Sequence, residues 1–113
     1  MLSRRHDDRA GEAGTLDSLG FIALRAGLHA EAVAHHSLAL ALRRELGDRY
    51  HEAGTQAGLA EACAACGRYE DACQAWQQVL ALCRVQHRTT DAVRIQRRLD
   101  TLRRAAQFAQ SQP

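Results

Sequence analysis

The sequence predicts an all-α fold, a right-handed stack of paired helices, and three observations lead to this prediction. Segments 12–51 and 52–91 are identical at 11 of 40 aligned positions, so the chain of 113 residues repeats itself. The only proline is Pro113, so proline interrupts no helix interior. A glycine follows each of the first three expected helices, at Gly27, Gly47 and Gly67.

Each repeat contains two expected helices, which are separated by these glycines. The first helix is expected from about Glu12 to Ala26, and the second from about Ala30 to Leu46. Asp48 is a suitable N-cap for the third helix, which ends at Gly67. The repeats therefore span about 12–47 and 48–87.

The fourth helix carries Glu70 and Asp71 in its first turn, where acidic side chains suit the helix dipole, and it runs to about Gln86. A fifth helix is expected over about 90–109, because one apolar stripe continues through it. The apolar stripe consists of Ala92, Ile95, Leu99, Leu102, Ala106 and Ala109.

Together, these elements divide the chain into an expected frayed segment 1–10, a single domain 11–110 and a tail 111–113.

Charge is unevenly distributed, although the net charge of the chain is only +2. Residues 1–83 hold 8 arginines and 11 acidic residues, a net charge of −3, whereas residues 84–113 hold 7 arginines and 2 acidic residues, a net charge of +5. The first residues lack the apolar run of a signal peptide, and no stretch is long and apolar enough to span a bilayer. We therefore expect a cytoplasmic protein with reduced cysteines.

The repeated positions resemble the tetratricopeptide repeat family, in which large and small residues alternate at fixed places. The resemblance covers about residues 12–110, and its sharpest part is the run Gly67-Arg68-Tyr69-Glu70-Asp71-Ala72. In the first repeat the matching positions are Leu19-Gly20, Gly27, Ala32 and Ala39. In the second repeat they are Leu59-Ala60, Gly67, Tyr69, Ala72, Trp76 and Val79.

The resemblance implies that Ala32 and Ala72 are inaccessible, that Leu19 faces its own repeat, and that His36 occupies the packing position of Trp76. Asp100 stands at a small-residue position, so the fifth helix is expected to end the stack as a solvated cap. The period of 40 resembles the arrays of actinobacterial antibiotic regulatory proteins and their NB-ARC relatives. Regulatory or scaffolding work is implied, without the DNA- or nucleotide-binding domains of those proteins.

Candidate chemistry is sparse, and we expect no enzyme activity, cofactor or metal. Cys63 and Cys66 form a CxxC motif, but they close a helix, where the dipole does not activate a thiolate. Cys63 falls at a core position, so free thiols are favoured over a zinc or redox site. His35 and His36 are adjacent and point in different directions on a helix.

The resemblance predicts that the first helix of each unit lines a concave groove for a protein or peptide. An acidic segment suits the arginines of the fifth helix. The alternative is nucleic-acid binding by these arginines, although no aromatic residues interleave with them. Self-association is also expected, because five large apolar residues crowd onto the first helix. The predicted partner-binding residues are Asp17, Phe21, Leu24, Glu61, Arg94, Arg97 and Arg104.

Overall fold

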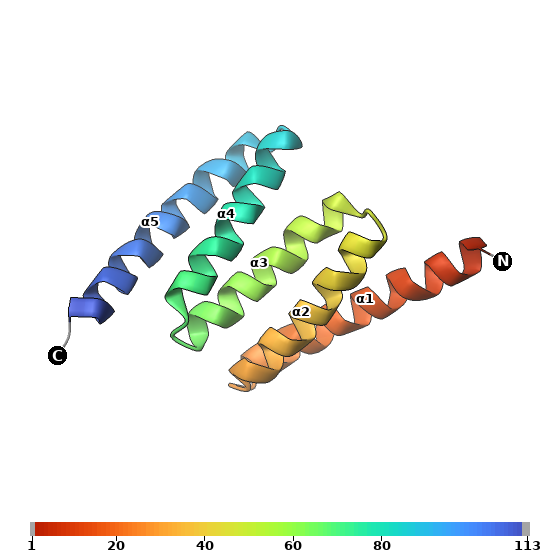
Figure 1. Ribbon diagram of the computed structural model, residues 1–113, viewed down its shortest axis with the longest axis horizontal. Helices are drawn as coiled ribbons and strands as arrows, with labels where there is room; N and C mark the ends of the chain where they lie inside the picture. The colour runs from red at the N-terminus through yellow and green to blue at the C-terminus, as the bar shows by residue number, and fades with distance from the viewer. Residues whose placement is uncertain (1, 112–113) are drawn as a thin grey trace.

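The computed structural model describes residues 2–111, with side chains from residue 8 onward. It confirms the all-α fold and the five helices over this part of the chain. Figure 1 shows the helices following one another across the molecule, with the two termini at opposite ends. The helices are α1 (Leu2–Arg25), α2 (His29–Glu45), α3 (Arg49–Ala65), α4 (Tyr69–Val85) and α5 (Thr89–Ser111).

Four turns of three residues each, spaced by 20 residues, reverse the chain between the helices. The middle residue of each turn is left-handed, with φ of 80°, 69° and 77° at the three glycines and 57° at His87. Glycine adopts this conformation without steric cost, which explains its use in three of the turns. In each turn, the residue after the left-handed one donates its backbone N–H to the carbonyl five positions earlier, at 2.8–2.9 Å, as in a Schellman motif.

The predicted boundaries hold within a few residues, except at the N-terminus. Asp48 caps α3 as predicted, because its carboxylate accepts the backbone N–H of His51 at 3.1 Å. The first helix was expected from about Glu12, whereas α1 begins at Leu2. Arg9 forms an ion pair with Glu45 of α2, which ties this early part of α1 to its neighbour.

Each helix packs mainly against the helices before and after it in the chain, and α1 also touches α3. The molecule is a flat, elongated body of 57 × 33 × 18 Å. Between residues 2 and 111, no helix has the length and apolar character needed to cross a membrane.

The apolar core is concentrated in the second half of the molecule. Ala32 and Ala72 are fully buried, as predicted, and Trp76 lies in the larger cluster formed by α3, α4 and α5. Among the side chains from residue 8 onward, the first half shows a small apolar cluster of alanines from α1, α2 and α3. The prediction for Leu19 was wrong: the residue is 42% exposed, because within residues 2–111 α1 packs against α2 and α3 and no other helix covers its outer face.

Candidate functional site

A polar network joins α1, α2 and α3 where the first half of the molecule has little apolar core. The Asp17 carboxylate of α1 accepts a hydrogen bond from His36 Nδ1 of α2 at 3.0 Å and from Thr55 Oγ1 of α3 at 2.6 Å. Arg43 of α2 lies with Nη2 3.5 Å from Asp17 Oδ2. One carboxylate therefore connects three helices.

His36 is fully buried at the centre of this network, in line with its predicted packing position. Two glycines make room for its ring. A Cβ atom added at Gly20 or at Gly58 would lie 2.6 Å from ring atoms of His36. The Phe21 ring meets His36 edge-on, with ring centroids 5.1 Å apart. His36 is thus wedged between α1 and α3.

Asp17 titrates below its ordinary range. Burial alone would raise its pKa, but the hydrogen bonds from His36 and Thr55 and the nearby charges of His36 and Arg43 outweigh burial and lower the pKa. The pKa of Asp48 is also lowered, because its burial is outweighed by the backbone N–H and ring of His51 and by the charge of Arg43. The network therefore favours ionised carboxylates.

A hollow of about 260 Å³ opens above this network between α1 and α3. Its walls combine two aromatic side chains, Phe21 and Tyr50, with two arginines, Arg43 and Arg88. The Arg88 guanidinium lies over the Tyr50 ring, 5.6 Å from its centroid. The complete lining is Asp17, Phe21, Arg43, Tyr50, His51, Gly54, Thr55 and Arg88.

A second, smaller hollow of about 130 Å³ adjoins the first, and it lies among α3, α4 and α5. The two hollows share Gly54 and Arg88. Arg94 of α5 lines the second hollow beside Asp91, whose carboxylate pairs with Arg88 Nε at 2.9 Å. Two adjoining hollows with arginines in their linings thus extend from α1 across α3 to α4 and α5.

The structure brings together only part of the predicted partner-binding set. Asp17 and Phe21 line the first hollow and Arg94 lines the second. Leu24 is half-buried against the small alanine cluster, so it contributes mainly to packing. The remaining predicted residues, Glu61, Arg97 and Arg104, are exposed and lie outside the linings of both hollows.

Sequence reasoning missed Arg43, Tyr50 and Arg88 as parts of the site. A signal for Arg43 was present, because the position one repeat later is Cys83, which is buried. An arginine at a core position needs a carboxylate partner, and Asp17 and Asp48 provide two.

The cysteines do not gather into a reactive centre in the part of the chain whose side chains are described. Cys63 is buried at its predicted core position, and Cys66 is exposed. Burial raises the pKa of the Cys63 and Cys83 thiols, which disfavours the thiolate. Within the described side chains, no group of three histidine, cysteine or acidic residues is arranged to hold a metal ion.

Comparison of the chain with models of known protein families gives no match, and comparison with curated proteins gives none either.

Proposed function

We propose that the chain is a protein-interaction module of the tetratricopeptide type, which binds an acidic or mixed-charge segment across α1, α3 and α5. The pair of adjoining hollows on this face supports the proposal more than any other observation. They offer exposed aromatic surface at Phe21 and Tyr50 beside the arginines Arg88 and Arg94. Arginine pairs carboxylates through two parallel hydrogen bonds, so acidic side chains of a partner suit these positions.

The exposed arginines Arg97 and Arg104 extend the basic surface along α5 and remain proposed anchors. Single exposed ion pairs contribute only about 0–1 kcal/mol each. Useful affinity therefore requires several arginines together with apolar contact to Phe21. The resemblance to the repeat arrays of actinobacterial antibiotic regulatory proteins suggests that binding of the partner serves a scaffolding or regulatory role.

A capped peptide that alternates glutamate with phenylalanine and leucine provides a direct test. We expect saturable binding by fluorescence anisotropy, and at least tenfold weaker binding for the double variants Arg88→Glu/Arg94→Glu and Arg97→Glu/Arg104→Glu. The matched control is Arg25→Glu, an exposed arginine of α1 that lines neither hollow. Equal affinity in the parent and both double variants would contradict the proposal.

Nucleic-acid binding by the arginines of α5 is the rival proposal. No aromatic residue stands between Arg94 and Arg104, so this surface lacks the side chains on which bases stack. If nucleic acid were the partner, affinity for a duplex oligonucleotide would fall steeply and linearly with the logarithm of salt concentration. We expect no measurable duplex binding at physiological salt.

We also propose that the chain associates with a second copy through α1. Ile22 is 64% exposed and Leu19 lies beside it, whereas the positions one repeat later, Ala62 and Leu59, are buried and half-buried. Sedimentation at micromolar concentration should show a dimer, and Phe21→Glu and Ile22→Glu should shift the protein toward monomer. A strictly monomeric parent would remove this second proposal and leave the peptide-binding proposal intact.

A further inference from the structure

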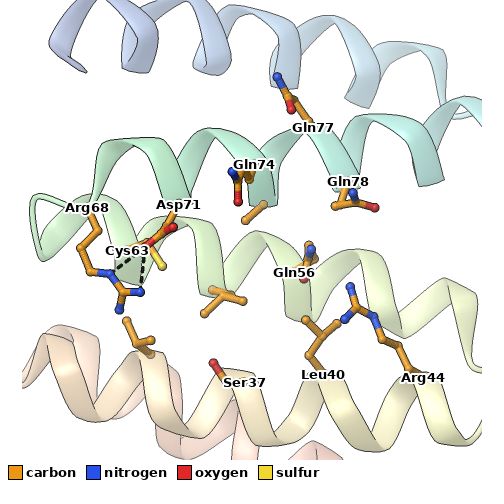
Figure 2. Close-up of a pocket in the computed structure, with 13 residues that line it drawn as sticks. Ser37, Leu40, Arg44, Gln56, Cys63, Arg68, Asp71, Gln74, Gln77 and Gln78 are labelled. Carbon is orange, nitrogen blue, oxygen red and sulfur yellow. Dashed lines mark hydrogen bonds and ion pairs between the residues drawn. The ribbon is translucent and has the colours of Figure 1, made fainter. Parts of the chain in front are cut away.

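A third and larger hollow lies on another side of the molecule. It is a groove of about 480 Å³ between α2 and α4, and α3 forms its floor (Figure 2). Leu40 of α2 and Leu59 of α3 give the groove apolar surface, and Gln74 and Gln78 of α4 give it amide groups. It shares no lining residue with the two hollows of the proposed peptide-binding face.

Gln56 occupies the floor of this groove with an unused hydrogen-bonding group. Only 5% of the surface of this residue is exposed. The Oε1 acceptor has no hydrogen-bond partner among the described residues. Figure 2 shows Gln56 between Leu40 and Gln78, at the middle of the groove. Buried acceptors in native proteins nearly always have a donor, so this site calls for one.

The charged residues of the groove are already paired and stand at its two ends. Arg68 Nη2 and Nε contact Asp71 Oδ2 at 2.7 and 2.8 Å at one end. Arg44 Nε lies 3.6 Å from Glu52 Oε2 at the other end. A phosphate or a strongly charged ligand finds no free counter-charge between them, so an uncharged ligand fits the groove.

We propose that the groove binds an extended, uncharged segment of a partner protein through its main chain. An extended chain presents free N–H and C=O groups, and a backbone N–H is the donor that Gln56 Oε1 lacks. Side-chain amides can donate and accept, which allows Gln74 and Gln78 to pair with the same backbone. A helical ligand has its backbone groups already satisfied and would leave Gln56 unpaired.

The spacing of the glutamines agrees with this occupant. Gln74 and Gln78 are one helical turn apart, about 6 Å along α4. An extended strand repeats its outward-facing backbone groups every two residues, about 6.8 Å. Gln77 also lines the groove and supplies a third amide group on α4. The apolar surface of Leu40 and Leu59 then receives a small apolar side chain of the ligand.

Isotope-labelled protein titrated with the capped peptide Ac-Thr-Val-Thr-Val-Thr-NH2 tests the proposal by nuclear magnetic resonance. Threonine and valine favour an extended backbone, and the caps remove the terminal charges. We expect saturable shifts of the side-chain amide signals of Gln56, Gln74 and Gln78. The same peptide with alternate backbone nitrogens methylated lacks those donors and should give no saturable shift.

Gln56→Leu removes the acceptor at nearly constant volume, and it should weaken binding of the peptide at least tenfold. Gln78→Ala, on the exposed wall, provides a second variant that does not touch the core. Gln107→Leu, on the exposed side of α5, is the control and should bind like the parent. Absence of saturable shifts at millimolar peptide would overturn the proposal. So would equal affinity of the parent and Gln56→Leu, or shifts confined to Phe21 and Tyr50.

Discussion

The two repeats place different chemistry at the same position of their second helix. His36 fills the position in the first repeat and is held by hydrogen bonds, whereas Trp76 fills it in the second repeat and is held by apolar contacts. Both side chains are buried. One backbone arrangement therefore accepts a polar interior or an apolar one, provided that the neighbouring residues fit the side chain.

The neighbours differ accordingly. His36 needs Gly20 and Gly58, because any Cβ at these positions would meet its ring at 2.6 Å. One repeat later the same positions are Ala60, which is buried in the apolar cluster, and Arg98, which is exposed. The packing around His36 in the first repeat is thus specified by polar partners and glycine. The packing around Trp76 in the second repeat is specified by the volume of apolar side chains. Four predictions test this difference.

Trp76→Ala should have the largest effect, because it empties the centre of the main apolar cluster. Truncating a buried tryptophan typically costs about 3–5 kcal/mol of unfolding free energy. Urea denaturation followed by circular dichroism measures the loss. A loss of unfolding free energy below about 1 kcal/mol would mean that packing in the second repeat does not depend on the volume of Trp76.

Gly58→Ala should destabilise the fold by about 1–3 kcal/mol, because the new methyl group would force His36 out of place. Gly54→Ala is the matched control in the same helix, since a Cβ there meets nothing within 4 Å. The control should gain about 0.5–1 kcal/mol from the higher helix propensity of alanine. Similar effects of the two substitutions would show that His36 has room to move.

Asp17→Asn should reduce the dependence of stability on acid. The folded-state pKa of Asp17 lies below its ordinary value, so the ionised form stabilises the fold above the unfolded pKa, and this contribution is lost as pH falls through the folded pKa. Melting temperatures measured between about pH 7 and pH 3 should therefore fall less steeply in the variant than in the parent. Asp100→Asn, an exposed carboxylate of α5, serves as the control. Parallel pH profiles of parent and Asp17→Asn would show that the network adds nothing to stability.

The smallest perturbation is chemical modification of the thiols under native conditions. Cys66 is exposed. Cys63 and Cys83 are buried in the larger apolar cluster of α3, α4 and α5, and burial raises the pKa of their thiols. Iodoacetamide should therefore modify Cys66 first, and mass spectrometry of digested protein measures the order. Trp76→Ala should accelerate modification of Cys83. An unchanged modification rate of Cys83 in this variant would show that the protection of its thiol does not depend on the packing of Trp76.

Much of the fold could be predicted from the sequence because its signals are local. Gly27, Gly47 and Gly67 mark turns by their own conformational freedom, and Asp48 marks a helix start. The early start of α1 was missed because residues 2–10 carry no apolar stripe, and the Arg9–Glu45 ion pair joins residues far apart in the sequence.

The candidate site could be predicted only in part, because its decisive contacts are not local. Asp17 was expected to face a partner, but it bonds to His36 and Thr55, which lie 19 and 38 residues further along the chain. The groove around Gln56 was not predicted at all, because a hollow between two helices depends on the shapes of side chains from three elements. Periodicity gives the face of a helix, but not the space left between neighbouring helices.

The pattern of contacts between neighbouring helices has a consequence for how the native state opens. Since α1 packs mainly on α2, and touches α3 less, its release leaves the main apolar cluster of α3, α4 and α5 intact. Such a molecule does not have a single uniform opening free energy. Its amide protons should exchange with deuterated water in a gradient along the chain, fastest in α1 and slowest in the helices around Trp76.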